Sequence, residues 1–105
     1  MAHRAIDLHV HPATAEWLVD GLGPYFEATT RHFRTEIPVR SVDEMAAEFA
    51  ADDVLAVLFA WDAESGMGLP PTTNDFVADC VARHPDTFLG FASVDLLAWG
   101  MTALA

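Results

Sequence analysis

The chain has 105 residues, of which 52% are hydrophobic and 20% are charged, so it can form one compact domain and is unlike a disordered protein. It contains 16 Asp and Glu residues against 5 Lys and Arg, which gives a formal net charge of −11. Because so acidic a chain is repelled by phosphate groups, we expect neither nucleic acid nor a membrane surface as a partner.

Cysteine content and apolar runs indicate the compartment. Cys80 is the only cysteine, so no intramolecular disulfide can form, which is typical of a reducing environment. No apolar stretch of the secretory type follows Met1. The longest apolar runs, residues 54–61 and 96–101, are too short to span a bilayer. We therefore expect a cytoplasmic protein.

The first 40 residues predict one strand followed by helices. Ala5–Val10 alternates apolar and polar side chains, which is the pattern of a strand, and Pro12 ends it. Residues 13–22 have a helical pattern that ends at glycines and a proline, and residues 25–33 predict a second short helix. Residues 34–40 are expected to form a loop.

A better-defined helix and a buried strand follow. Ser41 and Glu44 have the spacing of a capping box, which predicts a helix that ends at Asp52. Val54–Trp61 is a continuous apolar run without alternation, a pattern that favours a parallel strand buried on both faces.

The remaining pattern completes an alternation of strands and helices. Residues 62–72 predict a loop, Asn74 is a favourable N-cap for a helix over residues 75–83, and Phe88–Val94 predicts a third strand that ends at Asp95. Strands that alternate with helices are typical of parallel βα units. We therefore predict an α/β fold with a parallel order of three strands.

The strongest chemical signal is the pair His9 and His11 near the end of the first strand. Residues two apart in a strand face the same side, so Asp7, His9 and His11 are predicted to share one face, opposite Ile6 and Leu8. Two neutral imidazoles on one face can bind one divalent metal, zinc among them. The alternative is that the two histidines are incidental surface residues, since a His-x-His motif alone is weakly specific.

An ordered set of segments resembles the amidohydrolase superfamily, and within it the branch of aminocarboxymuconate semialdehyde decarboxylase-like proteins. Residues 6–12 (Ile-Asp-Leu-His-Val-His-Pro) resemble the opening strand of that family. Residues 39–45 and 54–61 are similar to its next helix and strand, and residues 74–77 and 83–95 are similar to the helix and strand that follow.

The resemblance covers roughly residues 4–95 and implies the N-terminal part, about three βα units, of a (β/α)8 TIM barrel. It also implies a divalent metal, often zinc, with His9 and His11 as the first-strand ligands. The family's other ligands and its general base come from later strands, and no position here matches them. The implied reaction is hydrolysis, or non-hydrolytic decarboxylation, of a small carboxylate or cyclic substrate.

Three further residues are candidates for the surroundings of the metal. Asp7 lies one step before the histidines and could orient a ligand, whereas Trp61 and Asp62 close the second strand, where barrel enzymes bind substrate. Packing and strand-end capping are the alternatives for Trp61 and Asp62. Cys80 lies on an apolar helical stripe, which favours a core residue over a nucleophile.

The end of the chain departs from the family pattern. Residues 1–95 are assigned to the barrel portion, and residues 96–105 to a divergent apolar tail without charge. The tail could start an ordinary helix, but a barrel needs at least about 200 residues, so we expect a truncated or frameshifted product.

Three hypotheses remain: a fragment of a metal-dependent enzyme, an inactive remnant or assembly module that needs a partner to complete its fold, and a small independent α/β metal-binding module. The last would need a third ligand nearby, and the sequence offers no obvious one. For the isolated chain we expect weak zinc binding, no hydrolase activity and self-association through open sheet edges.

Overall fold

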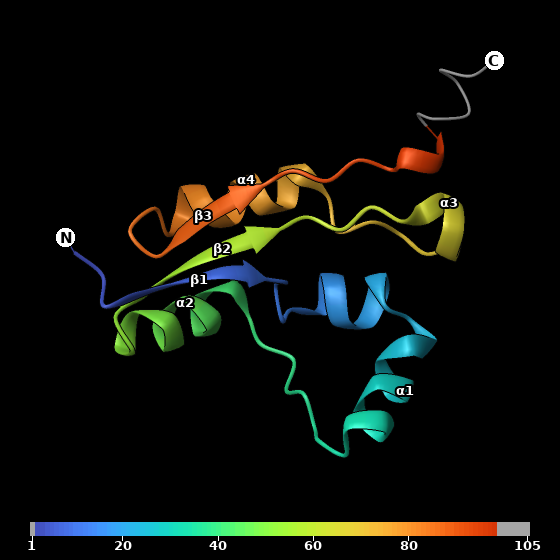
Figure 1. Cartoon of the computed structure of the whole chain (residues 1–105), viewed down its shortest axis with the longest axis horizontal. Coiled ribbons are helices and arrows are strands. Elements are labelled where there is room, and N and C mark those ends of the chain that lie inside the picture. Colours follow the sequence, from blue (N-terminus) through green and yellow to red (C-terminus); the bar gives the residue numbers. More distant parts are fainter. Residues whose placement is uncertain (1, 99–105) are drawn as a thin grey trace.

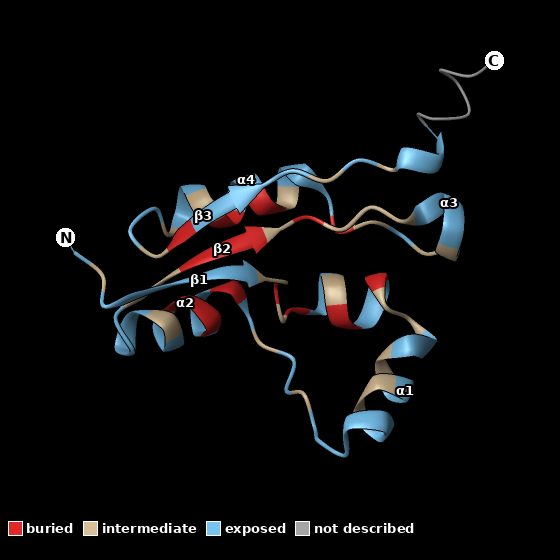
Figure 2. Cartoon of the chain, viewed as in Figure 1, coloured by how far each residue is buried: buried red, intermediate tan, exposed pale blue. Residues whose placement is uncertain are grey.

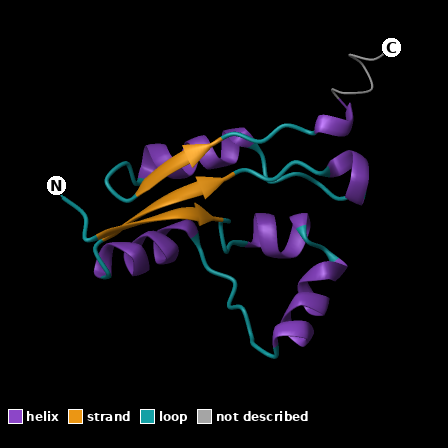
Figure 3. Cartoon of the chain, in the orientation of Figure 1, coloured by secondary structure: helices purple, strands orange, loops and turns teal. Residues whose placement is uncertain are grey.

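The computed structural model of the chain describes residues 2–98 (Figure 1). Strands alternate with helices along the described part of the chain, as Figure 3 shows. The strands are β1 (Ala5–Val10), β2 (Val54–Phe59) and β3 (Phe88–Phe91), and the helices are the π-helix η1 (Glu16–Gly21), α1 (Pro24–Phe33), α2 (Val42–Ala51), α3 (Glu64–Met67) and α4 (Asn74–Arg83).

The three strands form one open sheet in the order β1-β2-β3, and both pairings are parallel. The predicted α/β fold and parallel strand order are therefore confirmed. β2 and β3 end before the predicted Trp61 and Val94. Trp61 instead forms an antiparallel bridge with Thr72, and the backbone N–H of Ser93 donates to the side-chain oxygen of Asn74 at 2.8 Å.

Local capping signals explain where the helices begin. Ser41 and Glu44 form the predicted capping box, each side chain accepting from the backbone N–H of the other. The prediction of Asn74 as the N-cap of α4 was wrong. Thr73 takes that place, because its hydroxyl accepts a hydrogen bond from the backbone N–H of Phe76 at 3.0 Å. The side chain of Asn74 instead accepts a hydrogen bond from the backbone N–H of Ser93. The expected loop at residues 62–72 contains the short helix α3.

Helices α2 and α4 cover the same face of the sheet. Asp43 of α2 contacts both Arg83 and His84 at the end of α4, and the ring of Phe49 of α2 packs edge-on to Phe88 of β3. The core lies between these helices and the sheet; its buried members are Val42, Met45, Ala46, Ala56, Leu58, Ala60, Val77, Cys80 and Phe88. Figure 2 shows that β2 is buried, whereas β1 and β3 are largely exposed.

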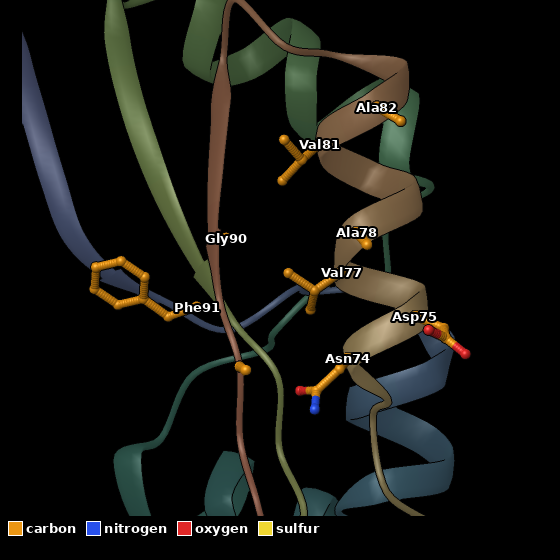
Figure 4. A pocket seen from close by; sticks show the side chains of 9 residues that line it. Asn74, Asp75, Val77, Ala78, Val81, Ala82, Gly90 and Phe91 are labelled. Atoms are coloured by element: carbon orange, nitrogen blue, oxygen red, sulfur yellow. The ribbon is translucent and has the colours of Figure 1, made fainter.

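The close approach of α4 to β3 requires glycine at position 90. A Cβ atom there would lie 2.7 Å from Cγ1 of Val77 and 3.1 Å from Cγ2 of Val81. In Figure 4 both valines point toward β3, while Phe91 points away from α4 onto the other face. A groove of about 530 Å³ lies along this contact, on the side of β3 that has no strand neighbour.

The opposite face of the sheet has no helix over its strands among residues 2–98, and it carries the histidine pair. Val57 of β2 is buried on this face, whereas Leu55 and Phe59 beside it are partly buried, so the predicted cover of β2 on both faces is complete only on the helix side. Within residues 2–98 no helix is long and apolar enough to cross a membrane. A helix begins at Leu96; the rest of the predicted tail, residues 99–105, lies outside the described residues.

Candidate metal centre

The two histidines meet at the C-terminal end of β1, as the sequence predicts. Nε2 of His9 lies 3.1 Å from Nε2 of His11, and the ring centroids are 5.0 Å apart. Both rings also contact Phe59 of β2, at 4.7 Å and 6.2 Å between centroids. The imidazoles therefore share one face of the sheet, and this part of the prediction is confirmed.

The separation of the two nitrogens fits two ligands of one metal ion. Nitrogens that bind a single tetrahedral zinc at about 2.0–2.1 Å lie about 3.3 Å from each other. The 3.1 Å contact between His9 and His11 is close to this value. Without a metal, the same contact allows one neutral ring to donate a hydrogen bond to the other.

The charge state of His11 also suits metal binding. Burial, and secondarily the neighbouring His9, lower the pKa of His11. A lowered pKa favours the neutral imidazole, which is the form that binds a metal. Its Nδ1 atom is buried and has no hydrogen-bond partner among the described residues.

Among residues 2–98 no group of three or more His, Cys, Asp or Glu side chains is arranged to hold a metal ion. A catalytic zinc usually has three protein ligands. The donor set of His9 and His11 thus fits part of such a centre, and its remaining ligands would come from outside the described residues.

A shift in strand register changes the position of Asp7. Asp7 pairs with Ala56 and Val10 pairs with Leu58, so three steps along β1 match two along β2. Because paired residues of parallel strands face the same side, Asp7 lies on the helix-covered face of Ala56 and Leu58. The prediction that Asp7 shares the face of the histidines was therefore wrong. Its carboxylate instead accepts a hydrogen bond from the backbone N–H of His9 at 3.2 Å.

The same register corrects the position of Ile6. Ile6 pairs with Leu55 of β2. Leu55 precedes Ala56 and therefore lies on the opposite face of the strand, which is the face of Phe59. Ile6 thus lies on the face of His9 and not, as predicted, opposite to it. The extra residue of β1 between Asp7 and Val10 interrupts the two-residue period of the strand, so the faces predicted for Ile6 and Asp7 from the sequence are exchanged.

Trp61 and Asp62 have different surroundings. Trp61 lies beside the pair, edge-on to His11 with 5.4 Å between ring centroids. The backbone N–H of Asp62 donates to the hydroxyl of Ser93 at 3.2 Å, and its carboxylate accepts from the N–H of Glu64 at 3.4 Å. These bonds place Asp62 just before α3. None of them bears on substrate, so the role of Asp62 toward substrate stays a prediction.

Sequence reasoning did not find two aromatic neighbours of the pair. Phe59 reaches His9 from the adjacent strand, and Trp17 of η1 stacks on His11 with 4.7 Å between centroids and 14° between ring planes. The spacing of Trp17, six residues after His11, was the available signal for its contact. It could not be interpreted without the path of the chain between them.

Comparisons of the chain with known proteins found no match. No protein-family model matches the chain, and no curated protein or solved structure is similar to it.

Proposed function

We propose that His9 and His11 are two ligands of a divalent metal, best fitted by zinc, in an enzyme of the amidohydrolase type. The observation that carries this proposal is the 3.1 Å separation of the two Nε2 atoms at the C-terminal end of a parallel strand. Barrel enzymes build their active sites at that end of the strands. A hydrogen bond between two neutral rings gives the same contact, so zinc titration of the chain and of its histidine variants distinguishes the two cases.

The architecture supports placing the three strands in a (β/α)8 barrel. Helices α2 and α4 both cover the face of Phe88, which is the arrangement that three successive βα units have in a barrel. In a barrel, all helices lie outside and polar side chains can project inward. The groove beside Val77 and Gly90 lies where the next helix of a barrel would pack.

The proposed reaction is hydrolysis or non-hydrolytic decarboxylation of a small carboxylate or cyclic substrate. When bound, the metal would polarise a substrate oxygen or lower the pKa of bound water. His9 and His11 would hold it. Trp61, which lies edge-on to His11, and Asp62, which follows it, would stand at the substrate side of the centre.

A specific observation also favours the second hypothesis, an assembly module that requires a partner. No third ligand joins the pair within residues 2–98, and Ile6, Leu89 and Phe91 leave apolar surface exposed on the strands. In the enzyme hypothesis other polypeptide would supply the remaining ligands, and in both hypotheses it would cover this face.

Zinc calorimetry on the whole chain tests the proposal. We expect weak binding at one site that disappears in His9→Ala and in His11→Ala, because each variant removes one of two ligands. His32→Ala is the matched control, since His32 lies on α1 against Phe33. Binding that survives both His9→Ala and His11→Ala would contradict the proposal, as would the absence of zinc binding.

A further inference from the structure

Two indole rings surround the imidazole of His11. Trp17 stacks nearly parallel on it, with 4.7 Å between centroids and 14° between planes, and Trp61 meets it edge-on at 5.4 Å and 85°. The indoles also contact each other, at 6.1 Å and 70°. The ring of His11 is thereby restricted from two directions, one along its face and one at its edge.

Within residues 2–98, His11 makes no hydrogen bond of the kind that usually orients a metal-binding histidine. Such a residue ordinarily donates its second ring N–H to a carboxylate, a carbonyl or water, which fixes the tautomer and the ring plane. Nδ1 of His11 is buried and has no such partner among residues 2–98. Within the described part of the chain, the orientation of the ring therefore depends on its aromatic contacts and on its contact with His9.

Trp17 is itself held in place by the backbone of η1 and its flanks. Its backbone N–H donates to the carbonyl of Thr14 at 3.3 Å, and its backbone carbonyl accepts from the N–H of Leu22 at 2.8 Å, whereas the buried indole Nε1 has no hydrogen-bond partner among residues 2–98. Leu18, next to it, is fully buried. A Cβ atom at Gly21 would lie 3.4 Å from Cδ1 of Trp17, so the last residue of η1 lies directly against the indole. These contacts give the ring a defined position from which it can restrain His11.

We propose that Trp17 is the positioning residue of the metal pair: its stacked indole holds the His11 ring so that Nε2 faces Nε2 of His9. The inference deepens the proposed function and rests on it. Stacking takes the place of the missing hydrogen bond to Nδ1. An aromatic ring of any kind at position 17 preserves the orientation, whereas an aliphatic side chain of similar burial releases it.

Two variants and two measurements test this role. Zn²⁺ affinity is measured by calorimetry for Trp17→Leu and Trp17→Phe, with Tyr25→Leu, an exposed aromatic of α1, as control. Removing a residue that orients a metal ligand commonly weakens metal binding about 10- to 100-fold. We therefore expect Zn²⁺ affinity to fall at least about tenfold in Trp17→Leu, and less than about threefold in Trp17→Phe and in Tyr25→Leu. Thermal unfolding of each metal-free variant establishes that it folds.

The second measurement needs no metal. In the metal-free protein, the rings of His9 and His11 should give a proton NOE between their Hε1 atoms, because both Hε1 atoms are adjacent to the facing Nε2 atoms. We expect this NOE to persist in Trp17→Phe and to vanish in folded Trp17→Leu. An NOE retained in Trp17→Leu would overturn the positioning role, as would its equal loss in folded Trp17→Phe.

The outcomes separate this inference from the proposed function. If the wild-type chain does not bind zinc, the proposed function fails, and the NOE still decides the role of Trp17. If His9→Ala abolishes binding but Trp17→Leu binds zinc as the wild type does, the metal site stands and the positioning role is overturned.

Discussion

Asp43 and His84 join the beginning of α2 to the end of α4 through a 2.7 Å hydrogen bond between Nε2 and Oδ1. The same oxygen accepts from Arg83 at 2.8 Å. These contacts, the bond from His84 first, lower the pKa of Asp43 below its usual value of 3.8. The two helices that cover the core thus share one charged contact at the surface.

The first prediction concerns acid stability. A carboxyl group with a depressed folded pKa contributes stability above its unfolded pKa, and this contribution is lost as the pH falls through the folded pKa. Asp43 should therefore help stability at neutral pH and lose that effect below about pH 4. Urea unfolding between pH 7 and pH 3 should show a flatter pH dependence in Asp43→Asn. Glu36→Gln, in the exposed segment before α2, is the control, and an equal flattening in both variants would contradict the account.

The second prediction concerns the packing of α4 against β3. Gly90→Ala places a methyl group 2.7 Å from Cγ1 of buried Val77, and overpacking of this kind commonly costs about 1–3 kcal/mol. Chemical denaturation should show that loss. In the matched control, Gly66→Ala, the new Cβ meets only Cδ1 of Leu97 at 3.7 Å, so stability should change little. If both glycine variants are equally stable, the helix does not lie as close to the strand as described.

The third prediction concerns the single cysteine. Burial, and secondarily Asp79, raise the pKa of Cys80 from 9.0 to about 11. At pH 8 this shift lowers the thiolate fraction about 100-fold, and burial adds a steric barrier. Iodoacetamide should therefore modify the folded chain at least about 100-fold more slowly than the chain in urea. Similar rates in both conditions would show that Cys80 is not part of the core.

The fourth prediction concerns self-association. Phe91, 55% exposed, lies on the face of the sheet opposite α2 and α4, and among residues 2–98 the outer edges of β1 and β3 pair with no strand. Because salt screens the net charge of −11 beyond about 8 Å, apolar contact should prevail at physiological ionic strength. Sedimentation should detect oligomers that Phe91→Lys weakens. The control Phe33→Lys alters a ring on α1 that is even more exposed, and a monomeric wild type would refute the prediction.

Features set by neighbouring residues could be predicted from the sequence. The capping box of Ser41 and Glu44 depends only on their spacing, and the apolar run that contains Val57 predicts the central parallel strand. The facing of His9 and His11 agrees with the two-residue period of a strand, although β1 shifts its register between Asp7 and Val10.

Features that depend on tertiary contacts could not be predicted. The extra residue of β1 appears only when the strand pairs with β2, and it moves Asp7 to the other face. The stacking of Trp17 on His11 depends on the course of residues 12–16 and on the wide turn of η1. Thr73 displaced Asn74 as N-cap because Asn74 had a partner 19 residues away.

The most direct test of the metal centre is the ¹⁵N NMR spectrum of the imidazole nitrogens during Zn²⁺ addition. Each ring presents Nε2 to the other, so the account predicts that the Nε2 signals of His9 and His11 move together at one stoichiometric equivalent, while both Nδ1 atoms stay protonated. The signals of His3, His32 and His84 should remain in place. Coordination through Nδ1, or movement of the other histidines without His9 and His11, would contradict the central claim.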